Sequence, residues 1–293
     1  MGNTYHDGAG YVLGLGDAAE GRALHQLFQL WAAAAFHEVG GDGPGRDAHH
    51  PDFRPQYAGE CHRDTVDGRF RGHIGNIAAG TGESGFIAVK PDDPDIVYIG
   101  AVGSSPGGHG ALQHYNHRTR QLRLVNIWPE EHFGLADRDL RNRFSWTFPI
   151  CFSPHDSGIF YACGNRVFVT HNEGQSWNSL SPDLTRADDS KLGVSGGLTV
   201  DSSGAETYGT ISTFVESPHQ KGYFLAGTDD GLVQLSQDGG GNWENVTPSG
   251  LPEWCYVYCI DASRHDPEVF YLSATSYKLD DYRPLLLKSE DGG

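Results

Sequence analysis

Hydrophobic residues in the second part of the chain come in short runs separated by polar turns. Four stretches repeat one pattern, an apolar run, a turn rich in Pro, His and Asp, and a second apolar run; they span residues 86–100, 150–164, 214–227 and 259–274. Such a pattern predicts an antiparallel β-hairpin. Because the spacing between successive hairpins varies, we expect one repeated unit joined by connections of different length.

A second motif follows three of these hairpins. Its consensus is Ser/Thr-x-Asp-x-Gly-x-x-Trp, and its copies are Thr170–Trp177, with Asn172 in place of Asp, Ser236–Trp243 and Ser289–Gly293. We expect the hydroxyl and the carboxylate to bond the backbone of a tight turn, Gly to take a positive φ, and Trp to pack between neighbouring sheets. The motif therefore predicts turns that shape a sheet rather than a catalytic site.

The hairpins and this motif together resemble the Asp-box, or BNR, repeat of β-propellers such as sialidases, xyloglucanases and sortilin-type receptors. Residues 81–293 are most similar to bacterial Asp-box propeller proteins labelled glycosyl hydrolase or sortilin-like. The likeness is carried by residues 80–87, 143–149, 164–168, 227–231 and 277–284. It implies an all-β fold, a partial β-propeller of about four antiparallel blades, with Trp177 and Trp243 buried between blades. Because such proteins usually carry larger propellers and the third motif stops at Gly293, before its Trp, we expect this chain to be part of a longer one.

Residues 1–80 differ in composition, being rich in Gly, Ala, His, Asp and Arg and poor in β-branched residues. We expect an irregular N-terminal segment, separate from the propeller of residues 81–293, with one helix over Glu20–Val39, where apolar residues recur at helical spacing. Potential metal ligands are scattered along it, namely His49, His50, Asp52, Cys61, His62 and His73. A loop rich in Gly, Pro and Asp does not hold such side chains in rigid convergence, so we predict no metal and no cofactor.

Charge and composition narrow the choice of partner. The chain has 293 residues and a formal charge of −17 at pH 7, which disfavours nucleic acid as a partner because its phosphates attract basic patches. No apolar run is long enough to span a bilayer, so we expect no membrane insertion. Residues 1–10 lack the pattern of a signal peptide, whereas the family resemblance implies export to the periplasm or the extracellular space.

Blade topology sends one set of loops to the side opposite the Asp-box turns, and those loops carry the candidate site. The candidate catalytic residues are two pairs of carboxylates in equivalent loops of adjacent blades, Asp229 with Asp230 and Asp280 with Asp281. Glycoside hydrolysis needs one carboxyl as acid and another as nucleophile or base. We expect these aspartates at exposed positions. The alternative is that they make turns and solvate the rim.

Aromatic and basic side chains on the same side are the candidate substrate-binding residues: Trp146, Tyr282, Arg283 and Arg143. Trp146 and Tyr282 offer planes on which a sugar can stack, and arginines can clamp a carboxylate or a phosphate. Alternatively, Arg143 and its neighbours Arg138 and Arg141 pair with acids of this acidic chain. The polar run that ends in Arg283 can instead lock neighbouring blades together.

Two classes of function are consistent with these features. The first is a carbohydrate-active propeller, a glycoside hydrolase if it is an enzyme, that hydrolyses or binds polysaccharide on its loop-rich face. The second is a non-catalytic, sortilin-like propeller that binds peptides or partner proteins. A pair of carboxylates about 5–10 Å apart in an open cleft lined by aromatic residues distinguishes the first from the second.

Overall fold

The computed structural model describes residues 86–100, 111–204 and 207–293. All of them belong to the second of the two units into which the chain divides, Gln56–Gly293. The predicted helix over Glu20–Val39 and the scattered ligands between His49 and His73 lie outside the described residues. The predicted domain boundary at residue 80 therefore stays a prediction.

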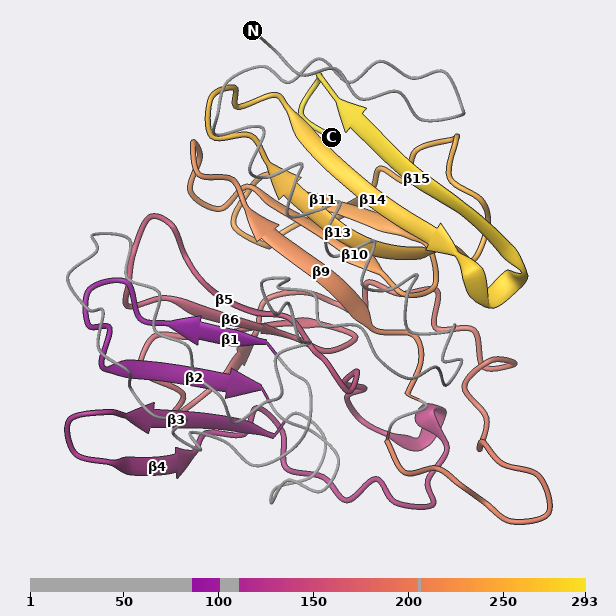
Figure 1. The fold of residues 1–293 in the computed structure, drawn as a ribbon, viewed down its shortest axis with the longest axis horizontal. Helices are drawn as coiled ribbons and strands as arrows, with labels where there is room; N and C mark the ends of the chain where they lie inside the picture. The colour runs from indigo at the N-terminus through magenta and orange to yellow at the C-terminus, as the bar shows by residue number, and fades with distance from the viewer. Residues whose placement is uncertain (1–85, 101–110, 205–206) are drawn as a thin grey trace, which may run out of the picture. The chain divides into compact units, whose positions relative to one another are not determined.

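Four antiparallel sheets follow one another in the described part of the chain, and we call them blades 1 to 4 (Figure 1). Blade 1 consists of β1 (Ile87–Val89), β2 (Ile96–Gly100), β3 (Leu112–Asn116) and β4 (Gln121–Leu124), and blade 2 of β5 (Ile150–Phe152), β6 (Phe160–Cys163), β7 (Val167–Thr170) and β8 (Asn178–Ser179). Blade 3 consists of β9 (Ile211–Glu216), β10 (Phe224–Thr228), β11 (Val233–Ser236) and β12 (Glu244–Asn245), and blade 4 of β13 (Tyr256–Ala262), β14 (Phe270–Ser276) and β15 (Asp281–Ser289). Two 3₁₀ turns, η1 (Asp137–Asp139) and η2 (Tyr277–Leu279), are the only helical elements assigned there.

Within each blade, strands that are consecutive in sequence are neighbours in the sheet. All four predicted hairpins form, each as the first two strands of a blade. A serine caps the turn in three of them: the Oγ of Ser153, Ser217 and Ser263 accepts a hydrogen bond from the backbone N–H two residues later. These hydroxyls satisfy a backbone donor that the strand ladder leaves unpaired.

Successive blades pack face to face through three apolar clusters. The first joins blades 1 and 2 and includes Tyr98, Leu112 and Phe160. A second joins blades 2 and 3, and a third joins blades 3 and 4. Sequential antiparallel meanders, of four strands in blades 1 to 3 and three described strands in blade 4, pack in this way and make the fold an all-β, partial propeller, as the sequence predicts.

The second motif forms the turn that follows the third strand of blades 2, 3 and 4. Its hydroxyl accepts a hydrogen bond from the N–H of the motif glycine, with distances of 3.0 Å for Thr170 and Gly174, 2.9 Å for Ser236 and Gly240, and 2.9 Å for Ser289 and Gly293. Gly174 and Gly240 have φ of +78° and +92°. The structure therefore gives this turn the geometry that the motif predicts.

The two tryptophans of this motif lie between blades. Trp177 is half-buried and packs against the cluster between blades 1 and 2, where its indole Nε1 donates to the Val125 carbonyl at 3.0 Å. Trp243 packs against the cluster between blades 2 and 3, stacked on Phe224 with ring centroids 6.2 Å apart. Each of them thus fills the seam between its own blade and the preceding one.

The blades have two chemically different edges. Turns between first and second strands share one edge with the motif turns, as the hydrogen bond from Gly239 N to the Gly222 carbonyl shows; we call it the turn edge. Loops between second and third strands and the connections between blades lie at the opposite edge, which we call the loop edge. The candidate residues predicted from the sequence belong to the loop edge. No helix of the described residues is long and apolar enough to cross a membrane.

Candidate functional site

Asp229 lies in the loop between β10 and β11 and is held by the residue that precedes β9. Thr210 donates its backbone N–H to Asp229 Oδ1 at 2.9 Å and its hydroxyl to Oδ2 at 2.8 Å, while Asp229 N–H donates to the Thr210 carbonyl at 3.0 Å. These bonds fix both carboxyl oxygens at the point where the chain enters blade 3. Asp229 is only 7% exposed.

Asp230 is held from a different side. Its carboxylate accepts hydrogen bonds from the Thr228 hydroxyl at 2.6 Å and from the Arg186 N–H at 2.8 Å. The Arg186 guanidinium donates to the Asp230 carbonyl at 2.8 Å as well. Asp230 is 2% exposed. The expectation that these two aspartates lie at exposed loop positions is therefore wrong, because Thr210 and Arg186 arrive from distant parts of the sequence and cover them.

Burial also sets the proton affinity of this pair. Loss of hydration raises the pKa of Asp229 to about 7, against the two bonds from Thr210, and the neighbouring charge of Asp230 raises it further. Burial raises the pKa of Asp230 too, although its hydrogen bonds oppose the shift. A carboxyl that holds its proton near neutral pH is the kind of group found in acid catalysis.

The second predicted pair lies where the loop after β14 meets β15, with Asp280 ending the loop and Asp281 beginning the strand, and it differs sharply from the first. Asp280 is exposed and follows η2 in a left-handed conformation, with φ of 60°. Asp281 accepts hydrogen bonds from Arg283 Nε at 2.9 Å and Nη2 at 2.6 Å, and these bonds lower its pKa to about 2. Tyr282 is 66% exposed. Asp281 is therefore ionised at neutral pH.

Lys278 connects the two loops. Its ammonium lies 5.7 Å from the centre of the Tyr256 ring at the start of β13. The charge of Lys278 opposes part of the rise in the pKa of Asp229, and the pKa of Tyr256 is raised by burial and by the charge of Asp229. The structure thus brings the β10–β11 and β14–β15 loops into electrostatic contact, as adjacent blades require.

Arg143 and Trp146 have partners inside the protein. Arg143 is 6% exposed; its Nη2 donates to Asp183 Oδ2 at 2.7 Å and its Nε to the Gly209 carbonyl at 3.0 Å. Trp146 is half-buried and packs against the cluster between blades 1 and 2. The alternative in which Arg143 pairs with an acid of this chain agrees with this geometry.

Sequence reasoning missed Trp254, which precedes β13 at the loop edge. The Arg186 guanidinium lies 4.4 Å from the centre of its ring, and the Lys191 ammonium 5.7 Å. The cation above this ring also holds Asp230, so Trp254 lies beside the acid pair. Nothing in the local sequence marks it, because its two cationic neighbours come from the connection between blades 2 and 3.

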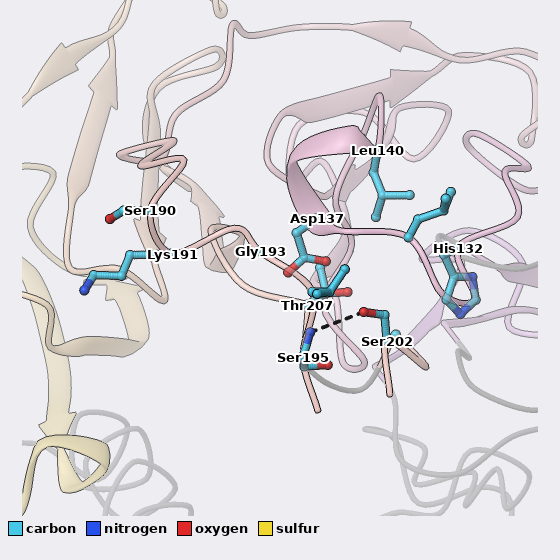
Figure 2. A pocket seen from close by; sticks show the side chains of 12 residues that line it. His132, Asp137, Leu140, Ser190, Lys191, Gly193, Ser195, Ser202 and Thr207 are labelled. Atoms are coloured by element: carbon cyan, nitrogen blue, oxygen red, sulfur yellow. Dashed lines mark hydrogen bonds between the residues drawn. The ribbon is translucent and has the colours of Figure 1, made fainter. Parts of the chain in front are cut away.

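A polar cavity of about 240 Å³ lies between the blade 1–2 and blade 2–3 connections (Figure 2), and its residue Lys191 also faces the Trp254 ring. Its lining includes His132, Asp137, Ser190, Lys191, Ser195 and Ser202. Asp137 Oδ2 accepts the Tyr208 N–H at 3.0 Å, and Tyr208 lies two residues before Thr210. Hydroxyl, carboxylate and ammonium groups gathered in one cavity suit a ligand with many hydroxyl groups.

The described residues contain no cluster of three or more potential metal ligands. Burial raises the pKa of the Cys151 and Cys259 thiols to about 12, so neither forms a thiolate at neutral pH.

Comparison with known proteins gives structural likeness only. No family model and no curated protein matches the sequence. Among solved structures, the chain is similar to the GH74 xyloglucanase from Xanthomonas campestris (16% identity, TM-score 0.45, covering 70% of this chain and 29% of that one) and to the GH74 enzyme of Niastella koreensis (15%, 0.39, 64% and 25%). It is also similar to the computationally designed Ika4 protein (15%, 0.38, 70% and 89%). The chain spans less than a third of the length of either GH74 enzyme.

Proposed function

We propose that this protein is a carbohydrate-active propeller of the Asp-box type, beginning near residue 81, which binds polysaccharide at its loop edge. The observation that carries the proposal is the polar cavity of about 240 Å³, whose lining residue Lys191 also lies 5.7 Å from the centre of the Trp254 ring. Sugars are bound by hydrogen-bonding side chains combined with an aromatic plane. Trp254, whose ring faces the same Arg186 that bonds Asp230, and the exposed Tyr282 are the candidate planes.

Glycoside cleavage is the reaction that this arrangement supports. Its acid must hold a proton and its partner must be ionised, and the two predicted pairs differ in that sense: the pKa of Asp229 is about 7 and that of Asp281 about 2. In this proposal Asp229 donates the proton to the glycosidic oxygen, after substrate displaces its bonds to Thr210. Asp281 acts as base or nucleophile, and Asp230 and Asp280 adjust the charge around them.

Titration calorimetry with soluble polysaccharides, xyloglucan among them, tests the binding. We expect Lys191→Ala and Asp137→Asn to weaken binding about tenfold each, which corresponds to the loss of one charged hydrogen bond. Glu290→Gln is the matched control, since Glu290 is exposed at the turn edge and bonds only Lys288 in the described structure. Unchanged affinity in both loop-edge variants overturns the assignment of the site.

Release of reducing ends tests the cleavage separately. Asp281→Asn should abolish it while leaving polysaccharide affinity intact, because Asp281 is half-buried at the surface and, among the described residues, its carboxylate is held by Arg283. Binding without cleavage in the unaltered protein removes the catalytic roles and keeps the binding function. If no polysaccharide binds, the sortilin-like class, which captures peptides or partner proteins, replaces the carbohydrate-active one.

A further inference from the structure

The seam between blades 1 and 2 differs from the later seams at one buried position of the third strand. In each blade this position lies two residues after the carbonyl that accepts a hydrogen bond from the residue following the fourth strand. Blades 2 and 3 have Val169 and Leu235 there, each paired with a residue of the second strand. Blade 1 has His114, paired with Tyr98. An imidazole thus stands where the other blades have an aliphatic side chain.

The imidazole of His114 is packed but not hydrogen-bonded. His114 is 4% exposed, and neither of its ring nitrogens has a hydrogen-bond partner among the described residues. Its ring lies edge-on to that of Tyr98, with centroids 5.0 Å apart. A buried polar group without a partner costs free energy that an aliphatic side chain does not. Packing alone therefore does not explain a histidine at this position.

The residue that faces His114 from blade 2, Glu173, is a second departure from the repeat. It lies in the motif turn with φ of +56°, whereas the equivalent residues of the other two copies are Gly239 and Gly292, with φ of +77° and +93°. A side chain in this left-handed conformation carries backbone strain that glycine avoids. Strain of this kind indicates that the side chain itself has a role in the seam.

Three basic side chains of blade 1 surround the carboxylate of Glu173. Lys90 Nζ donates to its Oε1 at 3.0 Å, while His114 Nε2 and Arg123 Nη2 lie 3.7 Å and 3.9 Å from its Oε2. Lys90 also lies 3.8 Å from Asp92. While the imidazole is neutral, two carboxylates balance the charges of Lys90 and Arg123. A proton on His114 adds a third cation to this cluster.

These surroundings favour the neutral imidazole. Burial of the ring and the charges of Arg123 and Lys90 lower the pKa of His114 from its ordinary value of 6.5, although the charge of Glu173 opposes the shift. When the seam opens, water reaches the ring and its pKa returns toward 6.5. Below that pH the open form binds more protons than the closed form, so the contribution of His114 to closure is complete above this value and falls as the pH decreases.

We propose that His114 makes the contact between blades 1 and 2 a pH-sensitive switch. At neutral pH the uncharged imidazole packs against Tyr98 and beside Glu173. In mild acid it takes up a proton, and the added cation loosens blade 1 from blade 2. Val169 and Leu235 do not ionise, so the later seams lack this response. The cluster lies next to the motif turn at the turn edge, so the switch does not depend on the polysaccharide site at the loop edge.

A pH titration of the full 293-residue chain by NMR tests the protonation step. The ring Cε1–H signals of the histidines are followed through the titration, and the signal that is missing from His114→Val belongs to His114. We expect its midpoint below 6.5. A midpoint at or above this value would mean that Glu173 holds the protonated ring in a closed seam, and it overturns the proposal.

Hydrogen exchange followed by mass spectrometry tests the opening itself. The quantity compared is the protection of the amides of residues 112–124 in blade 1, relative to their intrinsic exchange rates, with residues 224–236 of blade 3 as the internal reference. From about pH 8 to about pH 5, this protection should fall about fivefold further in the unaltered protein than in His114→Val, which carries the side chain found in blade 2. An equal fall in the two proteins overturns the proposal.

Glu173→Gln gives a second test that leaves the imidazole in place. This variant takes away the carboxylate beside the ring, so protonated His114 loses its counter-charge. The fall in protection toward acid pH should therefore grow by about twofold or more. Glu244→Gln is the matched control, since Glu244 is exposed on β12, and it should leave the fall unchanged. A fall in Glu173→Gln that is no larger than in the unaltered protein overturns the proposal.

Discussion

The imidazole of His155 in blade 2 donates from Nε2 to the backbone carbonyl of Ser217 in blade 3, at 2.8 Å. His219 in blade 3 makes the same bond to the Ser263 carbonyl in blade 4, at 3.0 Å. Both histidines follow the proline of a hairpin turn, so the bond repeats with the blade. It connects successive blades at the turn edge, where the packed seams end.

Replacement of His155 by Ala should lower the free energy of unfolding by about 1 kcal/mol, because the Ser217 carbonyl loses a partly buried donor. Thermal unfolding followed by circular dichroism measures the change. His171→Ala, at an exposed position in the turn after β7, is the control and should leave the transition unchanged. Equal effects of the two substitutions would show that the bond between blades contributes no stability.

Much of the fold follows from patterns that are local in sequence. Each predicted hairpin combines two apolar runs with a short turn, so its pairing needs only neighbouring residues. The recurrence of His155 and His219 after a proline is visible in the sequence as well. Its role is not, because the Ser217 and Ser263 carbonyls are brought near only when the blades stack.

The candidate site was harder to predict for the same reason. The loop that carries Asp229 and Asp230 is at the expected edge, but their burial depends on Thr210 and Arg186, which come from the connection between blades 2 and 3. Arg143 has an acidic partner 40 residues away in Asp183. A single sequence shows that these residues exist without showing which of them meet.

Stability should depend on pH through Asp229. Its pKa is about 7 in the folded protein and near the ordinary value of 3.8 in the unfolded chain. Between these values the folded state binds more protons than the unfolded state, so stability falls as pH rises from about 4 to about 7 and then stays low with respect to this group. Guanidinium unfolding measured at intervals across this range detects the effect.

The variant Asp229→Asn isolates this contribution. Asn can accept from the Thr210 N–H and donate to its hydroxyl, as the protonated acid does, but it does not ionise. We expect its stability to match that of the unaltered protein near pH 4 and to exceed it by roughly 2–4 kcal/mol at pH 8. A variant that is less stable than the parent at pH 8 would contradict the raised pKa.

Arg143→Ala should destabilise the protein by about 3–5 kcal/mol, because it leaves the half-buried Asp183 carboxylate without its cation. Burial alone would raise the pKa of the Asp183 carboxyl. The charge of Arg143 nevertheless helps to lower this pKa, which shows how strongly the pair is coupled. Arg120→Ala, at an exposed position of the turn between β3 and β4, is the control. Denaturant unfolding compares the two. A loss below 1 kcal/mol at Arg143 would free this side chain for the ligand-binding role that the sequence suggested.

The two seam tryptophans should respond differently to the same substitution. Trp177 Nε1 donates to the Val125 carbonyl at 3.0 Å, whereas the buried Nε1 of Trp243 has no hydrogen-bond partner among the residues that the structure describes. Phe in either place keeps an aromatic ring in the seam. The change common to both variants is therefore the loss of the apolar area that the larger indole buries. Trp177→Phe also leaves a carbonyl unpaired, while Trp243→Phe removes a donor that was already unpaired.

We therefore expect Trp177→Phe to cost about 1–2 kcal/mol more than Trp243→Phe in the free energy of unfolding. Each variant is the control for the other, because both tryptophans belong to the same motif and face the first residue of a second strand. Urea unfolding at fixed pH measures the difference. Equal costs would mean that the indole bond to Val125 is replaced by water in Trp177→Phe, and that the seams are held together by apolar contact alone.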